Sequence, residues 1–217
     1  MIEKFTSIVL PSIPDTLYMV FFSSLFSMLI GIPLALVLIV TRPGGLNPKP
    51  KGYQVLDTII NTLRSFPFVI LIMVVYPLSR LLIGKSIGPT AAIVPLTVAA
   101  IPFVARIMEG VFLEVDEGLV EAARAMGSTN GQILTKVILP ESLPSIINSM
   151  TMTIINIIGY SAMAGMLGAG GLGEIATRYG HYRNQLDILW MSVICIIIIV
   201  QVVQWIGNRL TNTTNKK

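Results

Sequence analysis

Long stretches without a charged residue constrain this 217-residue chain more than any other feature. Four stretches contain no Asp, Glu, Lys or Arg: residues 16–41, 86–105, 142–173 and 188–208. A fifth apolar stretch, residues 66–83, is interrupted by Arg80. Because about 20 apolar residues cross a bilayer as a helix, and because lipid requires every backbone polar group to be paired, the pattern predicts five membrane-spanning helices. We expect an all-α integral membrane protein.

The second of these spans is the weakest, since its charge-free part runs only from Ser65 to Ser79. It is expected to take in either the amphipathic residues before it or Leu81–Ile83. Proline is tolerated in a membrane helix where neighbouring helices or water satisfy the freed carbonyl, so prolines within spans predict kinked helices packed in a bundle. These prolines are Pro33, Pro77, Pro95 and Pro102.

Composition agrees with a membrane protein and excludes several other functions. Apolar residues make up 53% of the chain and charged residues 12%, far from the averages of soluble proteins. The single histidine, His181, excludes metal clusters of several histidines. It lies in a polar loop with Arg178 and Arg183, where we expect it to face solvent and not to form a Ser/His/Asp triad. Cys195 is the only cysteine, so no internal disulfide is possible. We expect no catalytic residue and no metal site in this chain, and a first apolar run retained as a span.

Orientation follows from lysine and arginine, because the cytoplasmic ends of spans carry an excess of both. If residues 114–144 lie inside, the cytoplasmic set is Arg42, Lys49, Lys51, Arg64, Arg106, Arg124, Lys136, Arg209, Lys216 and Lys217. The external set is then Lys4, Arg80, Lys85, Arg178 and Arg183. This excess predicts an external N-terminus and a cytoplasmic C-terminus.

Residues 114–144 form a polar island between apolar runs, with five of the chain's eleven acidic residues. Asp116 is expected to cap a first short helix and Gly127 to end it. One small apolar face is predicted from residues at helical spacing: Leu119, Ala122, Ala123 and Met126. A second helix over 132–139 is expected to follow a cap at 128–130 and to end at Pro140.

This pattern alone allows two interpretations, an ordinary surface loop or a docking helix for a partner. However, Glu121-Ala122-Ala123, with Gly127 and then Ile138-Leu139-Pro140, resembles the EAA loop of ATP-binding-cassette importer permeases. The resemblance implies that the loop is a coupling helix that fits a groove on a cytoplasmic ATPase. The coupling residues it implies are Glu121, Ala122, Ala123, Arg124, Met126 and Gly127.

Further stretches are similar to the permeases of methionine importers. They are Thr41-Arg42-Pro43-Gly44, Arg64-Ser65-Phe66-Pro67-Phe68, residues 91–106, Gly159-Tyr160-Ser161-Ala162-Met163 and residues 168–173. The resemblance implies a type I importer permease fold in the bacterial inner membrane, as a single domain over 1–217 with a core of about 13–206 and a coupling loop at 114–144.

The same resemblance implies partners and a cargo. The partners would be a second copy of the chain, two ATPase subunits that bind ATP and Mg²⁺, and an extracytoplasmic methionine-binding protein. The cargo would be L-methionine, with the D form left open, and the chain itself would be a non-catalytic permease subunit without a cofactor. No nucleic acid is expected as a partner, and the substrate rests on the resemblance alone.

The fourth span predicts a polar stripe on one helix face: Ser149, Thr153, Asn156, Tyr160 and Met163. Polar groups are costly against lipid, so the stripe is expected to face a cavity or to form hydrogen bonds between packed helices. Methionine is flexible and polarizable, which favours the hypothesis that Met163 closes an apolar gate. The candidate translocation residues are Met163, Tyr160, Asn156 and Ser161.

Two motifs lack the context that their chemistry requires. Gly84-Lys85-Ser86 resembles the end of a phosphate-binding loop, but Ser79 stands where that motif needs glycine. Gly168, Gly170 and Gly173 fit G-x-G-x-x-G without an alternating strand and helix pattern, so we expect close helix packing there instead.

Three rival functions remain at this stage. The first is the same machinery with another small amino acid or solute. The second is a channel or an ion-driven carrier, which is disfavoured because carriers usually need a charge within the membrane and the fourth and fifth spans contain none. The third is a structural membrane anchor, which does not account for the polar stripe.

Overall fold

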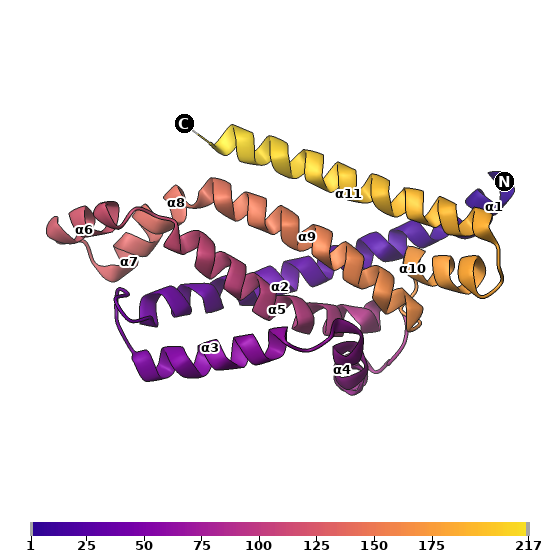
Figure 1. The fold of residues 1–217 in the computed structure, drawn as a ribbon, viewed down its shortest axis with the longest axis horizontal. Helices are drawn as coiled ribbons and strands as arrows, with labels where there is room; N and C mark the ends of the chain where they lie inside the picture. Colours follow the sequence, from indigo (N-terminus) through magenta and orange to yellow (C-terminus); the bar gives the residue numbers. More distant parts are fainter. Residues whose placement is uncertain (1, 216–217) are drawn as a thin grey trace.

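The computed structural model describes residues 2–215, and every regular element in that range is helical (Figure 1). The all-α prediction is confirmed. The helices are α1 (Ile2–Lys4), α2 (Ile13–Thr41), α3 (Pro50–Arg64), α4 (Phe68–Ile83), α5 (Pro89–Leu113), α6 (Glu117–Ala125), α7 (Asn130–Ile133), α8 (Leu139–Glu141), α9 (Leu143–Met166), α10 (Gly171–Ile175) and α11 (Leu186–Thr214). Four further turns are π-helical or 3₁₀: Phe5–Val9, Leu10–Ser12, Leu134–Ile138 and Ala176–His181.

Four helical stretches of the described chain are long and apolar enough to cross a membrane: Ile2–Thr41, Pro89–Leu113, Leu143–Met166 and Leu186–Thr214. A fifth crossing is present if α3 and α4, which are bent by 107° relative to each other, count as one span. The five predicted spans correspond to these four stretches and the bent pair. Pro33, Pro77, Pro95 and Pro102 all lie inside helices, as expected.

The second span follows one of the two expected extensions but is short for a complete crossing. Its helix, α4, contains 16 residues and is therefore about 24 Å long, which is less than the roughly 30 Å of a hydrocarbon core. It includes Leu81–Ile83 but does not continue straight from α3, because the chain bends at 65–67. The residue before a proline is biased away from helix, and Phe66 precedes Pro67 at this bend.

The fourth span is shorter than the uncharged run 142–173 suggested. Helix α9 ends at Met166, and the chain leaves the helical path where Gly168, Gly170 and Gly171 adopt positive φ angles. The prediction overextended the span because absence of charge does not mark the end of a helix. The predicted close packing is present, since a Cβ at Gly173 would collide with the carbonyl oxygen of Ala162 in α9.

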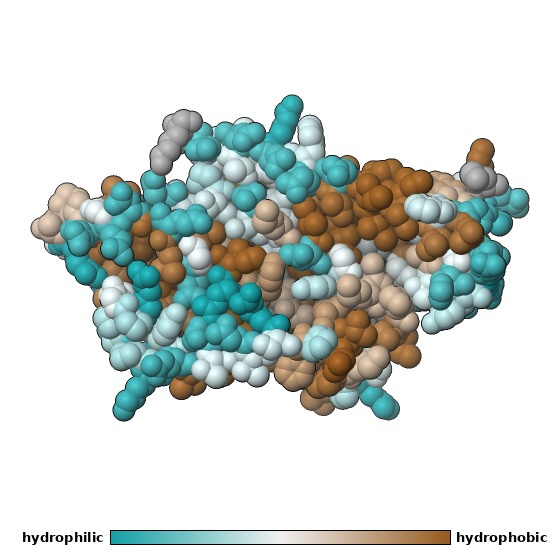
Figure 2. Space-filling model, in the orientation of Figure 1, coloured by the Kyte–Doolittle hydropathy of each residue, from teal (hydrophilic) through white to brown (hydrophobic). Residues whose placement is uncertain are grey.

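Helix α5 forms the centre of the bundle and contacts α2, α3, α4 and α9. In its most apolar window 61% of the residues are buried, compared with 17% for α11. Figure 1 shows α11 along one edge of the molecule, and Figure 2 shows hydrophobic residues gathered over its N-terminal half and over α4. Burial thus separates a packed central helix from an outer helix suited to contact lipid.

The two ends of the described chain lie at opposite ends of the bundle (Figure 1). The N-terminal turns lie beside α10 and α11, where the amine of Lys4 is 2.7 Å from a carboxylate oxygen of Asp187. The C-terminal end of α11 lies at the other end, near α8. The 114–144 segment and the glycine-rich 168–173 turn are therefore at opposite ends of the long helices.

Candidate coupling segment and translocation face

The first helix of the 114–144 segment begins and ends where the sequence predicted. The Asp116 side chain accepts a hydrogen bond from the backbone N–H of Gly118 at 2.7 Å and caps α6. Gly127 follows the helix with a φ of 81°, and the N–H of Ser128 then donates to the Ala123 carbonyl at 3.1 Å. A left-handed residue at this position is typical of a helix end and suits glycine best.

The second helix of the segment was predicted only in part. Among the three candidate caps, Thr129 fills the role and forms a capping box with Gln132. Pro140 does not end the helix, as was expected, but lies within α8. A π-helical turn over Leu134–Ile138 leads into α8, so Pro140 occupies a first-turn position where the missing N–H is tolerated.

The apolar residues of α6 are divided between its two sides. Ala123 is buried and joins a core cluster with Phe112, Ile133 and Ile138. Leu119 and Met126 are 45% and 79% exposed. The inner side fixes α6 to the bundle, while the outer side presents apolar surface that no described residue covers.

Of the six residues predicted for coupling, five are exposed and one is buried. The exposed residues are Glu121, Ala122, Arg124, Met126 and Gly127. Ala123 has 4% of its surface exposed, so its role within this chain is to seat α6. The outward face therefore consists of an acidic, a basic and two small or apolar residues next to a tight turn.

Polar contacts also hold the segment against the end of α2. Arg42 lies 3.8 Å from a carboxylate oxygen of Glu117, and the side-chain amide of Asn130 donates to the Leu46 carbonyl at 3.0 Å. A hollow of about 150 Å³ separates α6 from the 42–46 loop and is lined partly by Glu121 and Arg124. The segment is thus attached at several points to the end of α2 and to α5.

The polar stripe of α9 divides into a buried part and an open part. Thr153 is buried, and its hydroxyl donates to the Ser149 carbonyl at 2.8 Å. Ser161 is also buried and donates to the Ile158 carbonyl at 2.8 Å. These hydroxyls bond within their own helix, so for them neither an open cavity nor bonding between helices is observed.

The open part of α9 follows a heptad spacing. From residue 152 onward, the exposed positions of α9 are Met152, Asn156, Gly159, Met163 and Met166. The predicted stripe contained Asn156 and Met163 but not the other three residues, although their spacing of four and three residues is typical of one helix face. Met163 is 43% exposed, so a flexible apolar side chain points away from the packed core.

Tyr160 lies at the edge of this open face and connects it to α4. Its ring stacks on Phe68 with a centroid distance of 4.2 Å and an interplanar angle of 15°. Both rings line a hollow of about 150 Å³, whose other walls are Leu63, Arg64, Phe66, Leu71, Ala99 and Phe103. The predicted residue Tyr160 is therefore in contact with the bent α3–α4 pair, which sequence periodicity did not reveal.

Comparison with known proteins places these features in a family. Residues 27–215 match the family described as "Binding-protein-dependent transport system inner membrane component". The "Probable D-methionine transport system permease protein MetI" of Pasteurella multocida is 48% identical over 196 residues, which cover 90% of each chain. The "D-methionine transport system permease protein MetI" of Escherichia coli K12 is 50% identical over 151 residues, 70% of each chain.

Solved structures share the fold. A chain of the MetNI methionine ABC transporter, crystallised in inward-facing conformations, is 42% identical with a TM-score of 0.96 over 100% of both chains. A chain of an amino acid ABC transporter crystallised with histidines is 22% identical, with a TM-score of 0.74 over 98% of this chain and 94% of that one. The second likeness concerns the fold alone. The predicted type I importer permease fold is confirmed.

Proposed function

This chain belongs to the binding-protein-dependent transport system inner membrane components, and we propose that it forms half of the pathway of an ATP-binding-cassette importer for methionine. The observation that carries the proposal is that α6 has two different sides. Ala123 is packed in the core, whereas Leu119 and Met126 are exposed. An apolar surface left uncovered on a polar helix fits a partner with a matching groove. That partner is a cytoplasmic ATPase, present in two copies.

The coupling contacts are formed by Glu121, Ala122, Arg124, Met126 and Gly127, with Ala123 seating the helix from within. ATP and Mg²⁺ bind to the ATPase subunits, and no covalent chemistry takes place on this chain. Closure of the ATPase dimer moves α6, and its attachments to the ends of α2 and α5 pass the motion to the spans. The pathway then opens alternately to each side of the membrane.

The translocation pathway runs between two copies of this chain along the open face of α9. Asn156 supplies a polar contact on that face, and Met163 closes it with a flexible apolar side chain. Tyr160 contacts the passing solute, or it adjusts the position of the solute through its stacking with Phe68. Ser161 is buried and supports the helix behind the gate.

The topology that we propose places the N-terminus outside and the C-terminus in the cytoplasm of a bacterial inner membrane. It is supported by the lysine and arginine counts and by the opposite positions of the two ends in Figure 1. Residues 1–217 then form one transmembrane domain with a core of about 13–206 and a coupling loop at 114–144. The extracytoplasmic binding protein docks at the end that carries α10.

Methionine, as the L form with the D form as a second cargo, is the substrate supported by the names of the relatives. The test is uptake of labelled L-methionine into vesicles that contain the chain, its co-purifying ATPase and its binding protein. We expect ATP-dependent uptake that unlabelled L-methionine and, more weakly, D-methionine compete away. Competition by another small amino acid without competition by methionine would contradict the cargo but leave the importer intact.

A further inference from the structure

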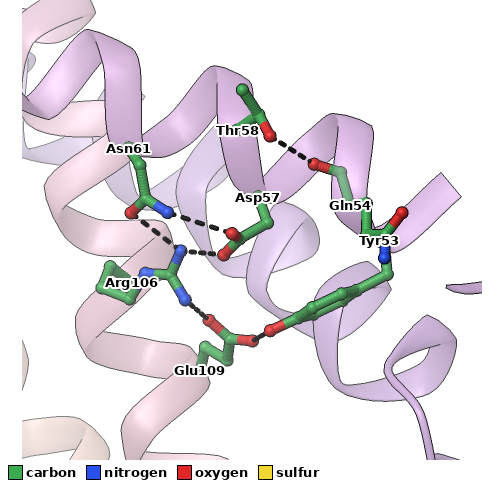
Figure 3. A network of polar contacts seen from close by, with 7 residues as sticks. All are labelled: Tyr53, Gln54, Asp57, Thr58, Asn61, Arg106 and Glu109. Atoms are coloured by element: carbon green, nitrogen blue, oxygen red, sulfur yellow. Dashed lines mark hydrogen bonds and ion pairs between the residues drawn. The ribbon is translucent and has the colours of Figure 1, made fainter. Parts of the chain in front are cut away.

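A network of five polar side chains joins α3 to α5 (Figure 3). Arg106 forms an ion pair with Asp57 and donates to Asn61 at 3.0 Å and to Glu109 at 2.6 Å. The Tyr53 hydroxyl donates to the other oxygen of Glu109 at 3.2 Å. The Asn61 amide donates to Asp57 at 3.0 Å. The guanidinium therefore bridges two carboxylates that come from different helices.

The stability of this network depends on its geometry, because part of it is buried. The Glu109 side chain is 3% exposed, whereas those of Arg106 and Asp57 are 26% and 29% exposed. A buried carboxylate is costly unless its oxygens are paired, and both oxygens of Glu109 have a donor. Such a pair adds little net stability compared with apolar packing, and in some proteins buried pairs of this kind fix one arrangement of the packed elements.

Apolar packing gives α3 only a small attachment to the bundle. Ile60 is its one buried residue, in a cluster with Leu38 of α2 and Ala105 of α5. Tyr53 and Leu56 of α3 are partly buried against the same cluster. The hydrogen bonds and the ion pair that α3 makes with another helix, among those described, are the ones to Arg106 and Glu109. The network therefore supplies the polar part of the attachment that places α3 along α5.

The network lies on α5 between the end that leads to α6 and the residue that lines the hollow shared by Tyr160 and Phe68. Arg106 is seven residues before the end of α5 at Leu113, which is about 10 Å along the helix axis and leads directly towards α6. One turn in the opposite direction, Phe103 lines the hollow that Tyr160 and Phe68 share. One face of α5 thus carries the contacts that lead towards α6 and those that line the hollow beside Tyr160.

The chain that follows α3 also reaches the hollow shared by Tyr160 and Phe68. It is followed by the bend at 65–67 and by α4, whose first residue, Phe68, stacks on Tyr160. Wherever α3 is fixed on α5, the start of α4 is fixed too. A shift of α5 relative to α3 would change the distance between Phe68 and the open face of α9.

We propose that Arg106, Asp57 and Glu109, with Tyr53, are positioning residues for transport. They hold the bent α3–α4 pair on α5, so that motion imposed at α6 is delivered to the Phe68–Tyr160 contact beside the pathway. The inference rests on the proposed function. It adds residues other than the coupling and pathway residues named above, and these residues act through other side chains.

The test measures methionine uptake and ATP hydrolysis in the same vesicles, with the complete importer. Asp57→Asn removes the charge that faces Arg106 and keeps the shape of the side chain, so we expect uptake per ATP hydrolysed to fall about tenfold, a factor typical of one charged hydrogen bond. Asp57→Glu keeps the charge and is expected to restore most of the ratio. Thr58→Ala is the matched control on α3, because its hydroxyl bonds only to the Gln54 carbonyl.

Tyr53→Phe removes a single hydroxyl, and it decides the question if Asp57→Asn fails to assemble with the ATPase. We expect it to lower uptake per ATP by about fivefold, the factor of one neutral hydrogen bond, with unchanged ATPase co-purification. Equal loss of uptake and hydrolysis, or no change of their ratio in either variant, would overturn the positioning role. Absence of uptake with the unaltered chain would instead overturn the proposed function, and this inference with it.

Discussion

Gly127 shows how one residue defines the end of the coupling helix. Its φ of 81° lies in the left-handed region, which costs other residues roughly 1–2 kcal/mol and β-branched residues more. We therefore expect Gly127→Val to distort the turn that displays Met126 and to reduce co-purification of the ATPase by about tenfold. Quantification of ATPase bound per permease after purification in detergent measures this effect.

Gly131 supplies the control for that substitution. It lies in α7, four residues further on, and a Cβ at this position meets no atom within 4 Å. Gly131→Ala is expected to leave ATPase binding unchanged. If both variants lost the ATPase equally, general disturbance of the segment rather than the left-handed turn would account for the effect.

Met163 is the residue on which the gate proposal depends. It is 43% exposed on the open face of α9, and an alanine there would leave a gap in an apolar constriction. We expect Met163→Ala to let preloaded methionine leave vesicles about tenfold faster without ATP, as a barrier lowered by about 1.4 kcal/mol would allow. Met73→Ala, which replaces a methionine that is 53% exposed on α4 and not on the open face of α9, is the control. Unchanged efflux, uptake and basal hydrolysis would remove Met163 from the gate.

Ala123 marks the limit of sequence reasoning at single residues. Its spacing with Leu119, Ala122 and Met126 indicated one apolar face, and its place in the EAA motif implied contact with the ATPase. Which side of a nine-residue helix is buried depends on the residues opposite, here Phe112, Ile133 and Ile138. Those come from other elements, so the local pattern could not decide between the inner and the outer side.

At the scale of elements, α6 makes a prediction that separates docking from folding. Met126→Asp places a charge on the outer surface, where substitutions change stability by less than about 0.5 kcal/mol, so it should weaken ATPase binding and leave the Tm of the purified permease unchanged. Ala123→Leu overfills the inner side, which costs about 1–3 kcal/mol, so it should lower the Tm.

If one side of α6 docks a partner and the other is packed in the core, Met126→Asp and Ala123→Leu must have different effects. The Tm of the purified permease and the amount of bound ATPase are measured on the same preparations. Loss of Tm without loss of ATPase in Met126→Asp would place Met126 in the core, contrary to its 79% exposure.

Among the elements, long helices could be predicted and their junctions could not. Uncharged runs and caps located α2, α5, α11 and both ends of α6, because these signals are local in sequence. The 107° bend between α3 and α4 depends on Pro67 together with packing on α5, and the Asp57–Arg106 pair joins residues 49 positions apart. Contacts of this kind have no periodic signature, so the network of Figure 3 became visible only in the folded chain.

At the scale of the whole molecule, topology links the external and cytoplasmic parts of the proposal. The Lys4–Asp187 ion pair keeps the N-terminus beside residues 181–187, so a label at Tyr182, which is 76% exposed, reports the side of the N-terminus. Exposed Gly131 reports the side of the coupling segment. Replacement of buried Cys195 by alanine gives a background in which either position can carry the only thiol.

In intact cells we expect a membrane-impermeant maleimide to label Tyr182→Cys and to leave Gly131→Cys unlabelled until the membrane is opened. This result is required by an odd number of crossings between the external N-terminus and the coupling segment and by the excess of cations on the cytoplasmic side. The reverse pattern would place α6 outside, where no cytoplasmic ATPase could bind it. Labelling of both positions in intact cells would contradict the crossing of α9, because this helix is the one candidate span of the described chain that separates Gly131 from Tyr182.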